Sequence, residues 1–367
     1  MLKIRMDKPI SKYRRIRKMI QKREETVVEK QNLDWANLGF SYTPTRSRYV
    51  SYYRDGKWDD GAMIADETIC LHESAGVLHY AQTCFEGLKA YRTQDGRLVV
   101  FRPELNAERM MNTCERLVMP QFPIERFCEA IDKVVRENAD FVPPHGSGAT
   151  FYLRPYIFGS GLVFGVNAAS EYTFRLFGTP VGSYMGVSNS IKLMVSSYDR
   201  AAPKGTGHVK AGINYGMSLY PKYVAKRAGY ADNLYLDAAT RSKVEEAGGA
   251  NFLFISRDGK VVTPKSPTIL PSITRRSLMQ IATDYLGLQC EEREVDLSEL
   301  KDFAECALCG TAAVLTPVAS VSDNGKEVVF ENSREKMGPI SQKLYDTLLG
   351  IQTGDIDPPE GWIHVIP

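Results

Sequence analysis

A carboxylate and an amide that could act on a bound ligand stand at the start of a segment with strong β-sheet signals. Glu246 and Asn251 are accompanied by two short runs that favour β-strands, residues 252–255 and 260–263. An Asp-Gly pair at 258–259, which is typical of hairpin turns, separates the two runs. The pattern predicts that the carboxylate and the amide lie at the mouth of a β-hairpin.

The same segment ends in a predicted helix start. Ser272 follows a proline-rich stretch and can cap a helix in which Ile273, Leu278 and Ile281 recur at helical spacing. The unpaired amides at a helix start bind anions, and phosphate is the natural occupant. A capped helix start taken alone is most often structural, so a phosphate site here requires support from other residues.

Lys210 is a candidate nucleophile. It lies in a run from 204 to 216 that is apolar and interrupted by glycines, unlike a solvated lysine-rich face. Partial burial lowers the pKa of a lysine and frees its amine for Schiff-base chemistry. Because most lysines are solvated, Lys210 alone would be interpreted as a surface residue.

These features occur together in the order and spacing of a known motif. The chain resembles the class IV aminotransferases of the branched-chain amino acid type, which use pyridoxal 5'-phosphate (PLP). The motif positions present are Glu246, Gly248, Asn251, Phe252, Thr263, Leu270, Ser272, Ile273 and Arg275. Leu253 stands where the family usually has Phe or Tyr, so we expect altered local packing and unaltered chemistry. The resemblance continues through residues 78–91, 101–110, 151–155 and 309–313.

The resemblance implies a set of cofactor-binding residues. Lys210 would form the Schiff base with PLP, and Glu246 would pair with the pyridine nitrogen and keep it protonated, so that the ring can accept electrons. Tyr215 would bond the phenolic oxygen of the ring. The remaining contacts, mostly to the phosphate, would come from Arg109, Asn251, the amides of Ile273 and Thr274, and Thr311.

The resemblance also implies a substrate site with an anion-binding end and apolar walls. The carboxylate would lie near Tyr80, Arg154 and the amides of Ala312 and Ala313. An apolar pocket suits branched side chains. Its walls would be Phe40, Phe85, Tyr152 and Tyr184, with Phe164 and Val166 reaching over from the partner subunit of a homodimer. Without the resemblance, each aromatic would be interpreted as core packing.

The implied activity is the reversible transfer of the amino group from L-leucine, L-isoleucine or L-valine to 2-oxoglutarate, with ping-pong kinetics. One alternative on the same fold is a D-amino acid aminotransferase or an aminodeoxychorismate lyase. Those relatives are shorter and lack the elements at 80–85 and 152–154. A second alternative is a non-catalytic PLP-binding protein, which need not keep Lys210, Tyr215 and Glu246 together.

Length and turn signals predict two domains. The expected fold is α/β (α+β), with a small α/β domain at 1–183, a linker at 184–190 and a large PLP-binding pseudo-barrel domain at 191–367. The cofactor would lie between the two domains. Expected helices are 104–117, 125–139 and 217–228, and expected strands include 192–196 and 233–236.

Composition favours an ordinary globular protein of the cytoplasm. The chain is 43% hydrophobic and 25% charged and has no apolar run long enough to cross a bilayer or to act as a signal peptide. Its seven cysteines lack disulfide-framework spacing, and Cys306 and Cys309 have no second pair to complete a zinc site. We therefore expect no metal, nucleic-acid or membrane partner.

The N-terminus is strongly basic. Residues 1–23 hold ten Lys or Arg and one Asp, a charge of +9, so with +2 overall the rest carries 2 − 9 = −7. Apolar residues fall on one helical face of this segment. Such a helix can bind membranes or nucleic acid or can resemble a transit peptide, and we favour an arm, 1–25, that docks on the acidic body.

Overall fold

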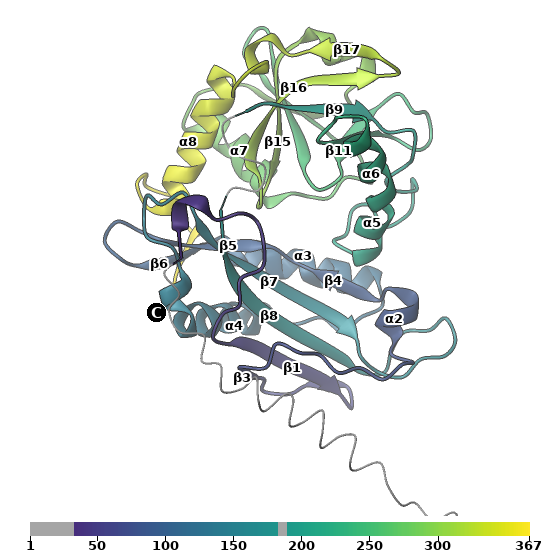
Figure 1. The fold of residues 1–367 in the computed structure, drawn as a ribbon, viewed down its shortest axis with the longest axis vertical. Coiled ribbons are helices and arrows are strands. Elements are labelled where there is room, and N and C mark those ends of the chain that lie inside the picture. Colours follow the sequence, from purple (N-terminus) through teal and green to yellow (C-terminus); the bar gives the residue numbers. More distant parts are fainter. Residues whose placement is uncertain (1–32, 183–188) are drawn as a thin grey trace, which may run out of the picture.

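The computed structural model describes residues 33–182 and 189–367. The predicted basic arm at 1–25 and Tyr184 therefore lie outside the described residues. The described chain forms two nine-stranded sheets, each accompanied by its own helices (Figure 1).

The first sheet is antiparallel and is built mainly from the N-terminal half. Its main path runs β18-β6-β5-β7-β8-β1-β2, with β3 paired to β1 and β4 paired to β7. The strands are β1 (Arg48–Arg54), β2 (Lys57–Trp58), β3 (Ala62–Ile64), β4 (Thr83–Phe85), β5 (Leu88–Arg92), β6 (Leu98–Phe101), β7 (Thr150–Gly159), β8 (Tyr172–Val181) and β18 (Ile363–Val365).

Two helices cover one face of this sheet, α3 (Pro103–Arg116) and α4 (Ile124–Glu137) (Figure 1). α4 has a continuous apolar stripe, so Phe127, Ile131 and Val134 become fully buried in one cluster with Phe151 of β7 and Phe174 of β8. The helices predicted at 104–117 and 125–139 are thus confirmed to within two residues. Shorter helices are η1 (Trp35–Asn37), α2 (Gly76–Tyr80) and η2 (Ala139–Phe141).

The second sheet closes on itself. Its path is β11-β10-β9-β16-β15-β12-β13-β14, and β11 also pairs with β12, so six strands form a ring. The closing pair in the register is Glu246 opposite Asn251. The strands are β9 (Ile191–Val195), β10 (Asp232–Leu236), β11 (Val244–Ala247), β12 (Asn251–Ser256), β13 (Val261–Pro264), β14 (Cys290–Arg293), β15 (Phe303–Gly310), β16 (Val314–Asp323) and β17 (Lys326–Val329). The predicted pseudo-barrel is this ring.

β12 is buried on both faces, as its apolar run requires. Phe252 and Phe254 lie in the cluster inside the ring, whereas Leu253 and Ile255 lie in a second cluster that packs against helices. These helices are α7 (Ile273–Asp284) and α8 (Pro339–Thr353). Leu253 is fully buried there, so its departure from the family pattern is accommodated in the packing beneath α7 and α8.

The predicted hairpin and the α7 cap are confirmed. β12 and β13 pair antiparallel, and Gly259 in the connecting turn has φ +87°, a conformation that glycine adopts without strain. The Ser272 side chain accepts a hydrogen bond from the Arg275 amide at 3.2 Å. α7 ends at Asp284.

The helix predicted at 217–228 is α6 (Leu219–Arg227) and is confirmed to within two residues, and a shorter helix, α5 (Gly212–Met217), precedes it. A single residue, Ser218, separates α5 from α6, and its hydroxyl donates to the Asn214 carbonyl at 3.1 Å. This local bond competes with a continuous helix. The remaining short helices are η3 (Leu297–Asp302) and η4 (Glu331–Ser333).

The C-terminal strand β18 returns to the first sheet and pairs with β6. The last residues therefore belong structurally to the sheet that holds the N-terminal half. The domain boundaries 1–183, 184–190 and 191–367 stay a prediction. None of the helices within residues 33–182 and 189–367 is long and apolar enough to cross a membrane.

Candidate active site

A cavity of about 410 Å³ is lined by residues of both sheets. The first sheet and its helices contribute Phe85, Arg109, Tyr152 and Arg154, and Phe40 reaches it from the segment before β1. The second contributes Arg200, Lys210, Tyr215, Glu246, Asn251, Leu270, Ser272, Thr311, Ala312 and Ala313. Most of the predicted site residues thus converge on one space.

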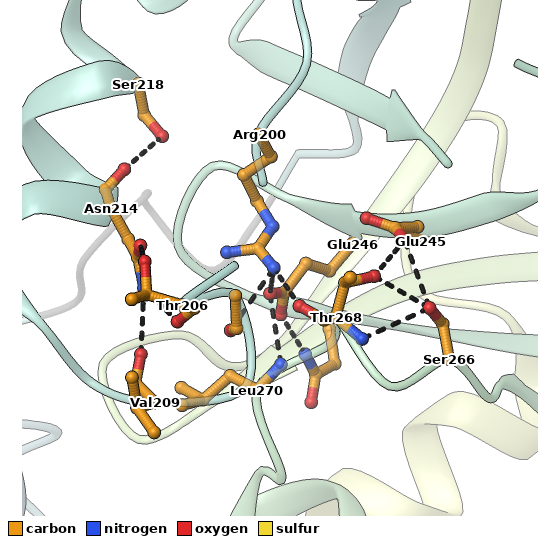
Figure 2. Close-up of polar contacts among 12 residues, drawn as sticks. Arg200, Thr206, Val209, Asn214, Ser218, Glu245, Glu246, Ser266, Thr268 and Leu270 are labelled. Atoms are coloured by element: carbon orange, nitrogen blue, oxygen red, sulfur yellow. Dashed lines mark hydrogen bonds and ion pairs between the residues drawn. The ribbon is translucent and has the colours of Figure 1, made fainter. Parts of the chain in front are cut away.

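Lys210 lies in the segment before α5 and is held by its backbone to the first sheet. Its amide donates to the Thr113 hydroxyl of α3 at 3.0 Å, and its carbonyl accepts from the Phe85 amide of β4 at 3.2 Å. Asn214 fixes the preceding loop by donating to the carbonyls of Thr206 and Val209 at 2.7 and 2.9 Å (Figure 2). The lysine position is therefore set by several elements at once.

The amine of Lys210 has a polar and an aromatic neighbour. Its Nζ donates to the Tyr215 hydroxyl at 2.9 Å and lies 4.9 Å from the centroid of the Phe85 ring. Phe85 and Tyr215 pack edge to face, with centroids 4.7 Å apart. The amine is thus half-buried between two rings with one hydroxyl to exchange a proton with.

Glu246 lies in β11 at the seam of the ring of strands, and it is 5% exposed. Its Oε2 accepts from the Asn251 side-chain amide, and its Oε1 accepts from the Leu270 amide at 3.2 Å. Arg200 forms an ion pair with Oε1 at 2.9 Å. Burial raises the pKa of the Glu246 carboxyl, and Arg200 opposes that rise.

Arg109 comes from α3 and reaches the start of α7. Its Nε and Nη2 donate to the two carboxylate oxygens of Glu86 at 2.8 and 2.7 Å, and its Nη1 donates to the Pro271 carbonyl at 3.0 Å. Glu86 is fully buried and also accepts from Asn106 at 2.8 Å. This fork-to-fork pair fixes the guanidinium beside the helix start.

The other predicted phosphate contacts are arranged around the same end. Ile273 and Thr274 are buried and are the first two residues of α7, so their amides belong to the unpaired first turn. Thr311 lies in the turn between β15 and β16, at the cavity wall. A guanidinium, helix-start amides and a hydroxyl are a donor set that suits a phosphate.

The substrate side of the cavity has aromatic walls and one arginine. Phe40 and Tyr152 meet edge to face with centroids 5.2 Å apart. The Arg154 guanidinium lies 4.9 Å from the Phe85 ring centroid and 5.3 Å from that of Tyr152. The buried Nε of Arg154 has no hydrogen-bond partner among the described residues, so it can serve a ligand carboxylate.

Three predicted substrate residues do not line this cavity. The Tyr80 hydroxyl donates to the Phe164 carbonyl at 2.6 Å, so these two residues stand together elsewhere. Phe164 and Val166 are 96% and 86% exposed. The structure thus separates Tyr80, Phe164 and Val166 from the cavity of their own chain.

The sequence reasoning missed Arg200, Glu86 and Asn106. Glu86 bonds the predicted residue Arg109, Arg200 bonds the predicted residue Glu246, and Asn106 supports Glu86. The resembling segments 78–91 and 101–110 contain Glu86 and Asn106 but assigned them no role. Two local signals stand near these residues in the sequence. Gly87 directly follows Glu86, and a glycine-rich run follows Arg200.

The donor set fits PLP. A lysine, a carboxylate and an anion-binding helix start face one cavity from three elements, which matches the aldehyde, ring nitrogen and phosphate of that cofactor. The buried Asn251 Oδ1 and Arg154 Nε have no partners within the described part of the chain. Both are available to a bound molecule.

The model of the amino-transferase class IV family matches residues 83–321. The chain therefore belongs to the class IV aminotransferases, which are PLP-dependent transaminases.

Proteins of similar sequence identify the type of class IV aminotransferase. A branched-chain-amino-acid aminotransferase of Haemophilus influenzae is 50% identical and is aligned over 91% of this chain and 98% of its own length. One from Helicobacter pylori is 46% identical over 92% of this chain and 98% of its own. Within its class the chain belongs to the branched-chain-amino-acid aminotransferases, and the predicted family and enzyme class are confirmed.

Solved structures agree with the fold. A branched-chain amino acid aminotransferase of Escherichia coli has a TM-score of 0.74 at 28% identity, covering 88% of this chain and all of the other. The PLP form of one from Thermobaculum terrenum also scores 0.74, at 25% identity over 89% of this chain and all of the other. The predicted fold type and cofactor are confirmed.

Proposed function

We propose that this enzyme reversibly transfers the amino group of L-leucine, L-isoleucine or L-valine to 2-oxoglutarate, giving branched 2-oxo acids and L-glutamate. The observation that carries the proposal is the convergence of Lys210, Glu246 and the α7 start on one cavity with aromatic walls. When bound, PLP supplies an electron sink for the substrate's Cα and carries the amino group between two half-reactions, so the kinetics are ping-pong.

Lys210 is the catalytic residue of the proposal. Its Nζ would hold the cofactor covalently and, once displaced by substrate, would take the proton from the substrate Cα and deliver it to the aldehyde carbon of the cofactor, C4′. The Tyr215 hydroxyl, 2.9 Å from Nζ, orients this amine. The Phe85 ring covers one side of the amine.

Other residues would hold the cofactor at its two ends. Glu246, aimed by Asn251, would keep the ring nitrogen protonated. Arg109, already fixed by Glu86, would bind the phosphate together with the amides of Ile273 and Thr274 and the hydroxyl of Thr311.

The substrate would be fixed by its carboxylate and selected by its side chain. Arg154 and the amides of Ala312 and Ala313 would take the carboxylate. Phe40, Phe85 and Tyr152 would form apolar walls for a branched side chain. Tyr184, proposed for the same wall, lies outside the described residues.

A homodimer would complete the site. Tyr80, Phe164 and Val166 stand together away from their own cavity, and the last two are highly exposed apolar residues. Such a group is expected to be covered. We propose that this group enters the partner's substrate pocket. We also propose that the enzyme acts in the cytoplasm.

The assay that tests the function follows glutamate formation by the purified, PLP-loaded enzyme. L-leucine, L-isoleucine, L-valine and D-alanine are each supplied with 2-oxoglutarate. We expect turnover of the three branched substrates and none of D-alanine. Turnover of D-alanine alone would favour the D-amino acid alternative, and PLP binding without any turnover would favour the non-catalytic one.

A further inference from the structure

Arg200 occupies the space behind Glu246. It lies between β9 and α5, its side chain is 6% exposed, and its Nη2 lies 2.9 Å from Glu246 Oε1. The same nitrogen donates to the carbonyls of Gly207, at 3.3 Å, and Thr268. Figure 2 shows the guanidinium pointing at Glu246 and Thr268.

Burial disfavours a negative charge on Glu246, and Arg200 is the positive charge that pairs directly with it. Its other hydrogen-bond donors are the neutral amides of Asn251 and Leu270. The neighbouring carboxylate of Glu245 is also buried and accepts from Ser266 and Thr268. The charged or titratable groups that face Glu246 are Arg200, Lys210, Glu245 and the Cys309 thiol.

The opposing effects have a definite order. Burial raises the pKa of Glu246 and is the largest influence, Arg200 and then the hydrogen bond from the Leu270 amide lower it, and Glu245 raises it further. Lys210 lowers it least of these, and in the proposed reaction that amine changes its bonding state during turnover. Arg200 is therefore the steady positive charge against which the carboxylate can stay ionised.

We propose that Arg200 is a positioning residue that keeps Glu246 ionised and aimed at the ring nitrogen of PLP. The inference rests on the proposed function, in which Glu246 pairs with that nitrogen. An ionised carboxylate holds a proton on the nitrogen, whereas a protonated carboxyl would donate its own hydrogen and leave the nitrogen neutral. Arg200 thereby governs how strongly the ring withdraws electrons.

Arg200 also joins two segments of the cofactor site. Its bonds to Gly207 and Thr268 join the loop that carries Lys210 to the segment that leads into α7. A Cβ at residue 207 would lie 2.7 Å from the Arg200 Nη2, so the glycine permits this approach. The arginine thus fixes Glu246 relative to both other ends of the cofactor site.

The test uses the holoenzyme loaded with PLP labelled with ¹⁵N at the ring nitrogen, whose resonance reports protonation. Four variants are compared: Arg200→Gln, Arg200→Lys, Glu246→Gln and Arg241→Gln. Arg241 is the matched control, because it bonds Asp199 and the Ser196 carbonyl of the same segment without touching Glu246. We expect Arg200→Gln and Glu246→Gln to shift the resonance toward neutral nitrogen at neutral pH, and Arg200→Lys and Arg241→Gln to retain the wild-type value.

A second readout does not need the cofactor. In apo protein, infrared spectroscopy should show a protonated carboxyl band in Arg200→Gln that is absent from wild type and from the Arg200→Gln/Glu246→Gln double variant. In the holoenzyme, kcat of Arg200→Gln should fall by about 10–100-fold, the loss typical of a residue that orients a group in contact with the reacting centre. KM for leucine should stay near the wild-type value.

The outcomes separate the inference from the function on which it rests. If Arg200→Gln retains the wild-type nitrogen resonance while Glu246→Gln changes it, the role of Arg200 is wrong. If Glu246→Gln also leaves it unchanged, the proposed pairing of Glu246 with the ring is wrong. If Arg200→Gln does not fold, Arg200→Lys decides, because loss of nitrogen protonation with the charge retained would overturn the proposal.

Discussion

Lys210 carries the chemistry at the scale of single residues, and a second lysine offers a strict comparison. Lys222 lines the same cavity and pairs with Asp232 at 3.5 Å. We predict that Lys210→Ala abolishes the cofactor adduct that borohydride traps on the protein and lowers kcat by several orders of magnitude, whereas Lys222→Ala retains the adduct. Mass spectrometry of the reduced, digested protein locates the modified lysine. An adduct that persists in Lys210→Ala would show that another lysine bonds the cofactor.

Lys89 of β5 makes a prediction on pH. It is buried, its Nζ donates to the Ala312 carbonyl at 3.3 Å, and burial lowers its pKa to about 8. In the unfolded chain a lysine keeps its proton to about pH 10.4. Between these values the unfolded state binds more protons, so raising the pH stabilises the folded state through this residue.

The measurement compares unfolding by urea from pH 8 to pH 10 in wild type, Lys89→Met and Lys57→Met. The free energy of unfolding of wild type should rise relative to Lys89→Met, by up to about 1.4 kcal/mol per pH unit. Lys57 is exposed on β2, so its substitution should leave the wild-type profile unchanged. Parallel profiles for wild type and Lys89→Met would contradict the prediction.

At the scale of elements, local signals were sufficient where an element depends on its own residues. The Asp258-Gly259 turn produced the β12–β13 hairpin, and Ser272 produced the α7 cap, because both act within a few residues. Helix α5 was not predicted, and the bond that separates it from α6, from the Ser218 hydroxyl to a carbonyl one turn back, leaves no interruption in the apolar pattern.

The α7 cap supports a prediction of stability. We expect Ser272→Ala to lower the free energy of unfolding by about 1 kcal/mol, because the Arg275 amide loses its acceptor. Ser272→Gly should lower it by only a few tenths of that amount, since glycine is tolerated at this position. Urea unfolding of the apo protein measures both. Equal losses in the two variants would show that side-chain packing, and not the cap, is responsible.

At the scale of the whole molecule, the contacts that could not be predicted from the sequence are those between segments far apart along the chain. Arg200, which follows β9, meets Glu246 of β11 only in the folded ring of strands, and Glu86 meets Arg109 only when β4 packs on α3. Neither pair has a spacing that could be read along the chain. The family resemblance placed Lys210, Glu246 and Tyr215 correctly in one cavity because it carries this three-dimensional information, but it carried no information on their supporting residues.

The last prediction concerns the surface around Phe164 and its proposed contact with a partner subunit. If this loop enters a partner's pocket, Phe164→Asp should weaken the dimer and raise KM for leucine, because a charge cannot be buried there without a large penalty. PLP content should stay near wild type, since Phe164 does not line the cavity of its own chain.

Val365→Asp is the matched control, because Val365 is an exposed apolar residue of β18, the edge strand of the first sheet that pairs with β6. Sedimentation velocity and leucine kinetics are measured on both variants. A monomeric wild type with full activity would remove the need for a partner. A dimeric Phe164→Asp variant with unchanged KM would place the dimer contact elsewhere, and the apolar pocket would then have to select branched side chains with the walls of one chain alone.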